Sequence, residues 1–149
     1  MSKLHVTQIA GFLKRRLQDV VDMRDYVNHR DAEQREKAFY TRALAALAVS
    51  YEVNIPLEEI APFITDGQRD GGIDLIYFDS TERTLYLVQS KWHGDGHGSI
   101  ELGEALKFID GVRRVLDNDL DELNERIQAR RGDIERALFD GAARFVLLI

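Results

Sequence analysis

The 149-residue chain has an ordinary composition for a globular protein, with 44% hydrophobic residues, 31% charged residues and a formal net charge of −6. It has no cysteine, which excludes disulfides and thiolate metal sites, and it shows neither an apolar run of the ~20 residues that a membrane span needs nor a signal-peptide core. We therefore expect one cytoplasmic domain, residues 1–149, without a membrane segment, and the net acidity by itself does not indicate a nucleic-acid-binding protein.

Three helices are predicted in the first part of the chain, residues 1–64. The first covers Leu4–Val27, where apolar residues recur at helical spacing. The second begins after Asp31, a residue type that caps helix N-termini, and runs through Ser50. Pro56 opens a short third helix in PLEEIAPFI.

The second part, residues 65–149, begins with a pattern typical of a β-hairpin. The loop TDGQRDGG precedes two segments rich in β-branched and aromatic residues, Ile73–Phe78 and Leu85–Ser90, which flank the turn DSTER. We expect both segments to be strands.

Helices and one more strand are predicted after the hairpin. Ser99 is expected to cap a helix from Ile100 to about Leu116, a further helix covers Leu120–Phe139 with Gly132 as a break, and RFVLLI forms a third, buried strand. This order of elements indicates an α/β sandwich. Because a buried strand seldom ends a chain with nothing to cover its edge, we expect an N-terminal fragment whose partner is the C-terminal region of a longer protein.

The alternation of side chains along the two hairpin strands predicts their register. If Phe78 pairs with Leu85, the apolar residues match, and Asp74 then faces Gln89. Lys91 shares the face of Gln89, so a polar trio collects at one end of the hairpin. A slip of one residue would put Asp74 on the opposite face.

The chemistry of this trio suits a metal site that acts on phosphate. Asp74 can bind a hard cation such as Mg²⁺, and the amide oxygen of Gln89 and the backbone carbonyl of Ser90 can add oxygen ligands. Lys91 supplies positive charge where phosphoryl charge develops. Residues 66–98 are rich in acids, whereas basic pairs lie elsewhere, which agrees with an acidic pocket that has basic flanks; the alternative is that these charges are solvated helix faces.

The same residues carry a family resemblance. GGID, a hydrophobic strand and then VQSK resemble the PD-(D/E)XK nuclease superfamily, and the Q-x-K form is similar to Mrr-type restriction endonucleases. The fuller run TDGQRDGGIDLIYFD…LYLVQSKW looks most like the N-terminal domain of abortive infection phage resistance (AIPR) proteins. The resemblance implies a restriction-endonuclease-like three-layer α/β sandwich with a mixed central sheet and an N-terminal helical segment.

The resemblance also implies a site and a function. It makes Asp74, Gln89 and Lys91 the active-site trio, with a further metal ligand from an early helix, either Glu36 or one of its alternatives Glu33 and Glu52. The implied activity is an Mg²⁺- or Mn²⁺-dependent endonuclease that hydrolyses phosphodiester bonds of nucleic acid, DNA in the first place, in phage defence or restriction. Double-strand cutters usually need two sites, which suggests a homodimer.

Gln89 departs from the commoner acidic pattern of the superfamily. Because a neutral amide is a weaker Mg²⁺ ligand than a carboxylate, the activity could be weak, need another metal or be lost. The alternative function is therefore a catalytically inactive nuclease-like domain for nucleic-acid binding or dimerisation.

Structural alternatives also exist for single residues of the motif region. Asp74 could be a turn or cap residue at the start of its strand, and Lys91 an edge lysine that discourages strand pairing. Asp70 could hold a metal ligand in place or only form a turn, and Trp92 could stack on a base or pack under its loop.

Two rival metal sites are disfavoured by spacing. Asp66, Asp70 and Asp74 are four residues apart, whereas a calcium-binding loop needs oxygen ligands at alternate positions. His93 and His97 have no third zinc ligand nearby in the sequence and are expected to be plain loop residues.

Overall fold

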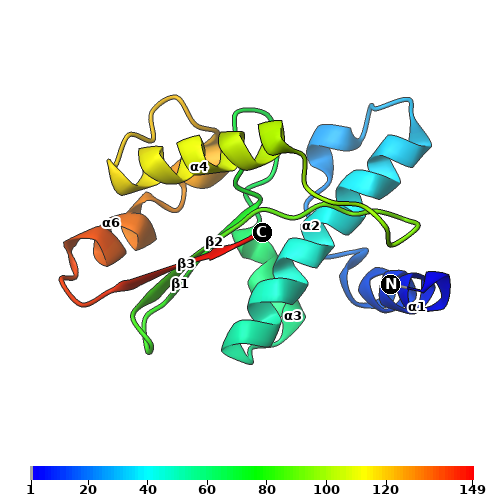
Figure 1. Cartoon of the computed structure of the whole chain (residues 1–149), viewed down its shortest axis with the longest axis horizontal. Coiled ribbons are helices and arrows are strands. Elements are labelled where there is room, and N and C mark those ends of the chain that lie inside the picture. Colours follow the sequence, from blue (N-terminus) through cyan, green and yellow to red (C-terminus); the bar gives the residue numbers. More distant parts are fainter. Residues whose placement is uncertain (1) are drawn as a thin grey trace. The chain divides into compact units, whose positions relative to one another are not determined.

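The computed structural model describes residues 2–149, which form a mixed α/β protein with a three-stranded sheet (Figure 1). The chain divides into two compact units. Unit 1 runs from the start of the described chain to Pro62 and includes Ser90–Ser99, and unit 2 consists of Phe63–Gln89 and Ile100–Ile149. No helix in residues 2–149 has the length and apolarity needed to cross a membrane.

Unit 1 is helical. Its α-helices are α1 (Lys3–Leu17), α2 (Ala32–Val53) and α3 (Leu57–Ile60), and α2 packs against the other two. The prediction that α2 begins after Asp31 is confirmed, since the Asp31 carboxylate accepts hydrogen bonds from the backbone N–H groups of Glu33 and Gln34 at 2.9 and 3.1 Å.

The first helix is shorter than predicted, because it ends at Leu17 rather than Val27. The side chain of Arg42 is fully buried and holds the following segment, which includes a short 3-10 helix at Arg24–Tyr26, away from the path of a continued α-helix. Its guanidinium donates to the carbonyl of Asp22 at 2.6 Å and to both carboxylate oxygens of Asp25 at 2.9 and 2.6 Å. A buried, bidentate arginine of this kind outweighs the helical spacing of a few apolar residues.

Unit 2 contains the sheet, whose strands are β1 (Leu75–Asp79), β2 (Thr84–Val88) and β3 (Arg144–Leu148) in the order β1-β2-β3. β1 and β2 are antiparallel, and β2 and β3 are parallel. The predicted register is confirmed, since Phe78 pairs with Leu85. The sheet is therefore mixed, and the mouth of the hairpin lies where the sequence placed it.

Three helices follow the hairpin, α4 (Leu102–Leu116), α5 (Glu125–Gln128) and α6 (Arg131–Phe139). The predicted Ser99 cap is wrong: α4 begins after Glu101, whose backbone N–H donates to the Glu104 carboxylate. The predicted helix over Leu120–Phe139 is two short helices, because the Asn124 side chain caps the start of α5 and the chain turns at Ala129 and Arg130, ahead of Gly132. One face of the sheet carries the core of unit 2, which includes Ile76, Leu85, Leu87, Phe108, Val112 and Val115.

The expectation that the third strand is buried is wrong. Phe145 and Leu147 of β3 are 38% and 50% exposed. The reason is that β3 is the edge strand, and the buried core of the unit ends at β2.

Candidate functional site

The segment before β1 folds back along the strand and carries two acidic residues to it. Ile64 forms an isolated bridge with Leu75, and the backbone N–H groups of Thr65 and Asp66 both donate to the carbonyl of Asp74, at 2.8 and 3.1 Å. Asp66 is therefore a close neighbour of Asp74, although eight residues separate them in the sequence.

Asp66, Asp70 and Asp74 form an acidic cluster in which each residue offers a carboxylate oxygen within 4.8 Å of the others. Asp70 and Asp74 are 5% and 6% exposed. The spacing disfavoured a calcium-binding loop, but the sequence did not predict this cluster, because a spacing of four residues in a loop gives no sign of where the loop turns. Grouped, buried carboxylates repel one another unless positive charge compensates them.

Asp70 has partners that fix its position. Its carboxylate accepts hydrogen bonds from the backbone N–H groups of Gly72 at 2.7 Å and Gly67 at 3.2 Å, so the turn-forming role is real. Lys107 of α4 also donates to it, with a distance of 2.6 Å between Nζ and Oδ1. Lys107 was missed by the sequence analysis, since nothing in a helical pattern shows that one of its lysines reaches a loop 37 residues away.

The glycine pair of the GGID motif lets this loop pack closely on α4. Gly71 and Gly72 both have positive φ values, +63° and +76°, which favour glycine. A Cβ on Gly72 would lie 2.9 Å from the backbone nitrogen of Phe108, and a Cβ on Gly111 would lie 2.2 Å from the carbonyl oxygen of Gly71. The space beside these glycines is thus filled by the backbone of α4.

Gln89 lies opposite Asp74 in the continuation of the β1–β2 register, so both side chains belong to the same face of the sheet. The backbone N–H of Asp74 donates to the carbonyl of Val88 at 2.7 Å, which keeps the hairpin closed at this end. The Gln89 side chain is 9% exposed, and its Nε2 donates to the carbonyl of Glu104 at 3.3 Å. Within residues 2–149, its Oε1 is buried without a hydrogen-bond partner.

An acceptor buried in this way costs about 1–3 kcal/mol unless something binds it. The oxygen of Gln89 is thus available to a ligand on the face of the sheet that it shares with the Asp74 side chain. A cation bound there would coordinate this amide oxygen and would also offset the negative charge of the carboxylates.

Ser90 and Lys91 follow Gln89 directly and belong to unit 1. The Ser90 hydroxyl donates to the carbonyl of Thr41 at 2.7 Å, and the backbone N–H of Trp92 donates to the Thr41 hydroxyl at 3.2 Å. The half-buried Lys91 therefore lies between two residues that are both hydrogen-bonded to α2. Asp74 and Gln89 are therefore neighbours within unit 2, whereas Ser90, Lys91 and Glu36 belong to unit 1.

Glu36, the predicted helix ligand, lies exposed on α2 and lines a cavity of about 540 Å³ in unit 1 together with Glu33. Glu52 lies near the other end of the same helix. Burial raises the pKa of the Tyr40 phenol in this cavity, and the negative charge of Glu36 raises it further. Trp92 stacks on the Tyr40 ring with 4.7 Å between the centroids, which is the packing role that the sequence weighed against base stacking.

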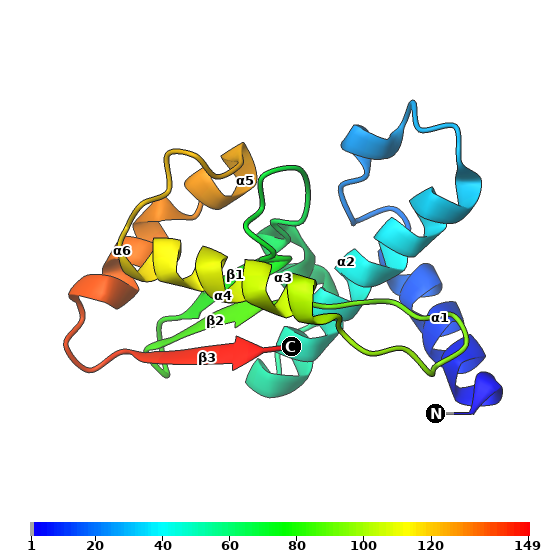
Figure 2. The ribbon, with the colours of Figure 1, turned by 45° about the horizontal axis from the view of Figure 1, so that its top comes forward.

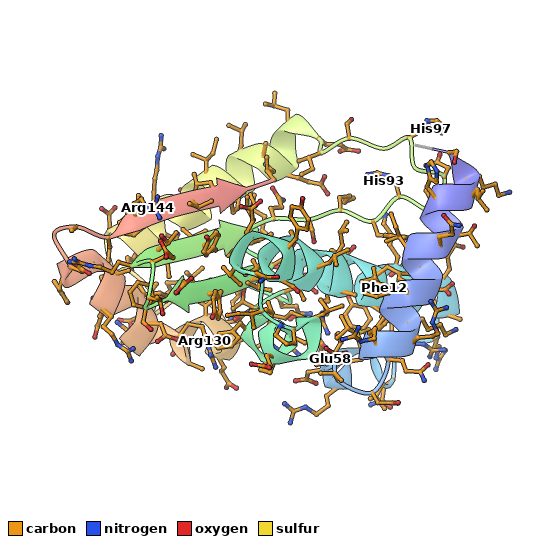
Figure 3. The ribbon with its side chains drawn as sticks, turned by 90° about the horizontal axis from the view of Figure 1, so that it is seen from below. Phe12, Glu58, His93, His97, Arg130 and Arg144 are labelled. Carbon is orange, nitrogen blue, oxygen red and sulfur yellow. The ribbon has the colours of Figure 1, made fainter. Side chains whose placement is uncertain are left out.

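The two histidines of the loop after Lys91 are labelled in Figure 3. The His93 ring occupies the space beside Gly98, where a Cβ would lie 1.8 Å from it. His97 is exposed, and its backbone N–H donates to the Asp95 carboxylate at 3.0 Å. Over residues 2–149, the only group of three or more potential metal ligands is the acidic cluster of unit 2.

Comparisons with known proteins find no relative of this chain. No protein-family model, no curated protein and no solved structure matches it. The resemblance to PD-(D/E)XK nucleases and AIPR proteins accordingly stays a prediction from the motif residues, and the function has to be inferred from the geometry of the site.

Proposed function

We propose that this protein is a metal-dependent endonuclease domain that hydrolyses phosphodiester bonds in nucleic acid. The observation that carries the proposal is the buried amide oxygen of Gln89, which has no hydrogen-bond partner among residues 2–149 and belongs to the residue paired with Asp74. Gln89 is the residue of the Asp74, Gln89 and Lys91 trio that departs from the acidic pattern, and its oxygen is the one left free to bind a metal.

The donor set fits Mg²⁺ or Mn²⁺. Carboxylate and amide oxygens are the ligands that these hard cations take, and the chain offers no thiolate that would favour a softer metal. Asp74 and Gln89, both in unit 2, would hold the ion. A divalent cation bound there supplies an acidic water and offsets negative charge on a phosphate.

Two ammonium groups are assigned to the substrate side of the site. Lys91 follows Gln89 by two residues and is proposed to stabilise the charge that develops on the phosphate. Lys107 contacts Asp70 while its side chain remains 56% exposed, so it can also meet an anion without leaving the cluster. This arrangement fits a site that acts on phosphate better than a site that only binds a cation, because lysine ammonium groups would disfavour cation binding alone.

The fold and biological setting belong to the same proposal. A mixed sheet in which an antiparallel hairpin is followed by helices and a parallel strand supports a restriction-endonuclease-like sandwich. On the strength of the motif resemblance we propose DNA as the substrate and phage defence as the setting.

A catalytically inactive, nucleic-acid-binding version of the domain is the second candidate. It is favoured by the neutral character of Gln89 and by the ammonium of Lys107, which already compensates Asp70. The two candidates differ in metal affinity, which is directly measurable.

Gln89→Glu is expected to tighten the binding of Mn²⁺ by at least about tenfold, because it replaces a neutral ligand by a charged one beside a dication. The measurement is isothermal titration of both forms with Mn²⁺ and Mg²⁺, paired with thermal melts. The melting temperature in the presence of metal should stay close to that of the wild type.

Gln34→Glu is the matched control, since Gln34 lies exposed in the first turn of α2 and its replacement should leave metal affinity unchanged. If Gln89 has only a structural role, a carboxylate at its position would be buried without compensation at a cost of several kcal/mol. A large loss of stability together with weaker metal binding would therefore contradict the proposed site.

A further inference from the structure

Unit 2 exposes a group of large apolar side chains along one helix and the neighbouring edge strand. Figures 2 and 3 both show α4 and β3 running in nearly the same direction. The exposed fractions of these side chains lie between 38% and 76%. We call them the α4–β3 surface, which consists of Leu102, Leu106, Ile109 and Leu116 of α4 and Phe145 and Leu147 of β3.

The helical part of this surface is a stripe. Leu102, Leu106, Ile109 and Leu116 recur at spacings of four, three and seven residues, which places them on one side of α4. The core-facing residues Phe108, Val112 and Val115 occupy the adjacent side of the helix. The apolar surface of α4 is therefore wider than the part of it that is buried in the core of unit 2.

The strand part faces the same side of the sheet as that core. Phe145 pairs with Leu85 and Leu147 with Leu87 in the parallel β2–β3 register, and both β2 residues lie in the core with α4. Paired residues on neighbouring strands point to the same face. The exposed β3 side chains and the exposed α4 stripe thus border one continuous area.

The backbone of β3 is also open along this edge. The Arg144 N–H donates to Arg83 and the Leu148 carbonyl accepts from Gln89, so the even-numbered residues of β3 direct their polar groups toward β2. The N–H and C=O groups of Phe145 and Leu147 consequently point away from the sheet. An apolar edge strand with open backbone groups is a template for another strand.

We infer that the α4–β3 surface is the interface with a second copy of this chain, formed by antiparallel pairing of β3 with β3 around a two-fold axis at Leu147. The occupant has to supply a strand edge and apolar side chains at alternate positions, and β3 itself supplies both. In this register Leu147 faces its own copy and Phe145 faces Ile149, so that every facing pair is apolar. The two three-stranded sheets become one six-stranded sheet.

The size of the surface agrees with a dimer. At roughly 100 Å² for each large apolar side chain, the six residues expose on the order of 600 Å², the upper end of what a monomer exposes in one patch. The open strand edge adds to this area, which brings the total near the ~800 Å² per partner of a standard interface. The inference rests on unit 2 alone and holds whether or not the domain cleaves nucleic acid.

The test is the oligomeric state of the full chain, measured by light scattering and sedimentation up to about 100 µM protein. We expect a dimer whose dissociation constant rises at least about 30-fold in Leu147→Lys, because a lysine at the axis faces its own copy. Leu106→Lys on α4 should weaken the dimer in the same direction without touching the strand, which keeps the test valid if the strand variant is poorly folded.

Phe139→Lys is the control, since Phe139 is 78% exposed in unit 2 and lies outside the surface. It should dimerise like the wild type. A wild-type monomer at the highest concentration or concentration-dependent growth beyond a dimer would overturn the inference. Dimerisation of the Leu147→Lys and Leu106→Lys variants that is as strong as that of the wild type would also overturn it.

Discussion

Replacing Gly111 by alanine is expected to lower the melting temperature of this protein by about 10 °C, which corresponds to about 3 kcal/mol for a chain of this size. The added Cβ would lie 2.2 Å from the carbonyl oxygen of Gly71, a distance that real Cβ atoms do not tolerate. The Gly71 carbonyl is part of the backbone, and the added Cβ is fixed directly to the backbone of α4. Neither group can therefore rotate away as the end of a flexible side chain could. Relief requires the loop of the acidic cluster to move away from α4.

The same substitution elsewhere on α4 gives the control. Gly103→Ala meets nothing within 4 Å and should leave stability unchanged or raise it slightly, since alanine favours a helix over glycine by up to about 1 kcal/mol. Thermal melts followed by circular dichroism compare the two variants. Equal effects at the two glycines would contradict the close packing of the motif loop on α4.

Lys91→Ala is expected to lower the rate of nucleic-acid cleavage at least about 100-fold, because the proposed role of the ammonium is to stabilise charge that develops at the phosphate. The free energy of unfolding should change by about 0.5 kcal/mol or less, as for other substitutions outside a core. The measurement is the rate of cleavage in Mn²⁺ at saturating protein, with the melting temperature recorded for the same sample.

Lys14→Ala serves as the control, because Lys14 is an exposed lysine in the last turn of α1 and has no proposed part in the site. It should cleave as the wild type does. A Lys91→Ala variant that cuts as fast as the wild type would exclude the catalytic role of this amine and shift attention to Lys107, the lysine that contacts the acidic cluster.

The parts of the fold that the sequence predicted correctly are those that depend on local rules. The register of the hairpin follows from the period-two alternation of its apolar residues, because only one pairing buries all of them. The start of α2 follows from Asp31, whose carboxylate can satisfy the free N–H groups of a first turn. Both are decided by residues a few positions apart.

The parts that could not be predicted depend on contacts between distant residues. The early end of α1 is set by Arg42, which binds Asp22 and Asp25 from another helix. The acidic cluster depends on how one loop folds back on β1, and its lysine comes from α4. Period and propensity carry no information about such pairs.

β3 was predicted to be buried for a related reason. RFVLLI reads as a core strand because its residues are apolar, but a sequence of this kind does not reveal which strand forms the edge of a sheet. The mismatch between an apolar strand and an exposed position is what points to a partner for that edge.

The most direct test of the proposed function is a cleavage assay on plasmid DNA with Mg²⁺, Mn²⁺ or EDTA, for the wild type and for Asp74→Asn. Asp74→Asn keeps the shape of the side chain and removes the charge that the proposed metal requires. We expect the wild type to nick or linearise the plasmid with metal and not with EDTA, and Asp74→Asn to lose at least about 100-fold in rate while remaining folded. Cleavage that persists in EDTA, or that proceeds at the wild-type rate in Asp74→Asn, would contradict a metal-dependent site at Asp74 and Gln89.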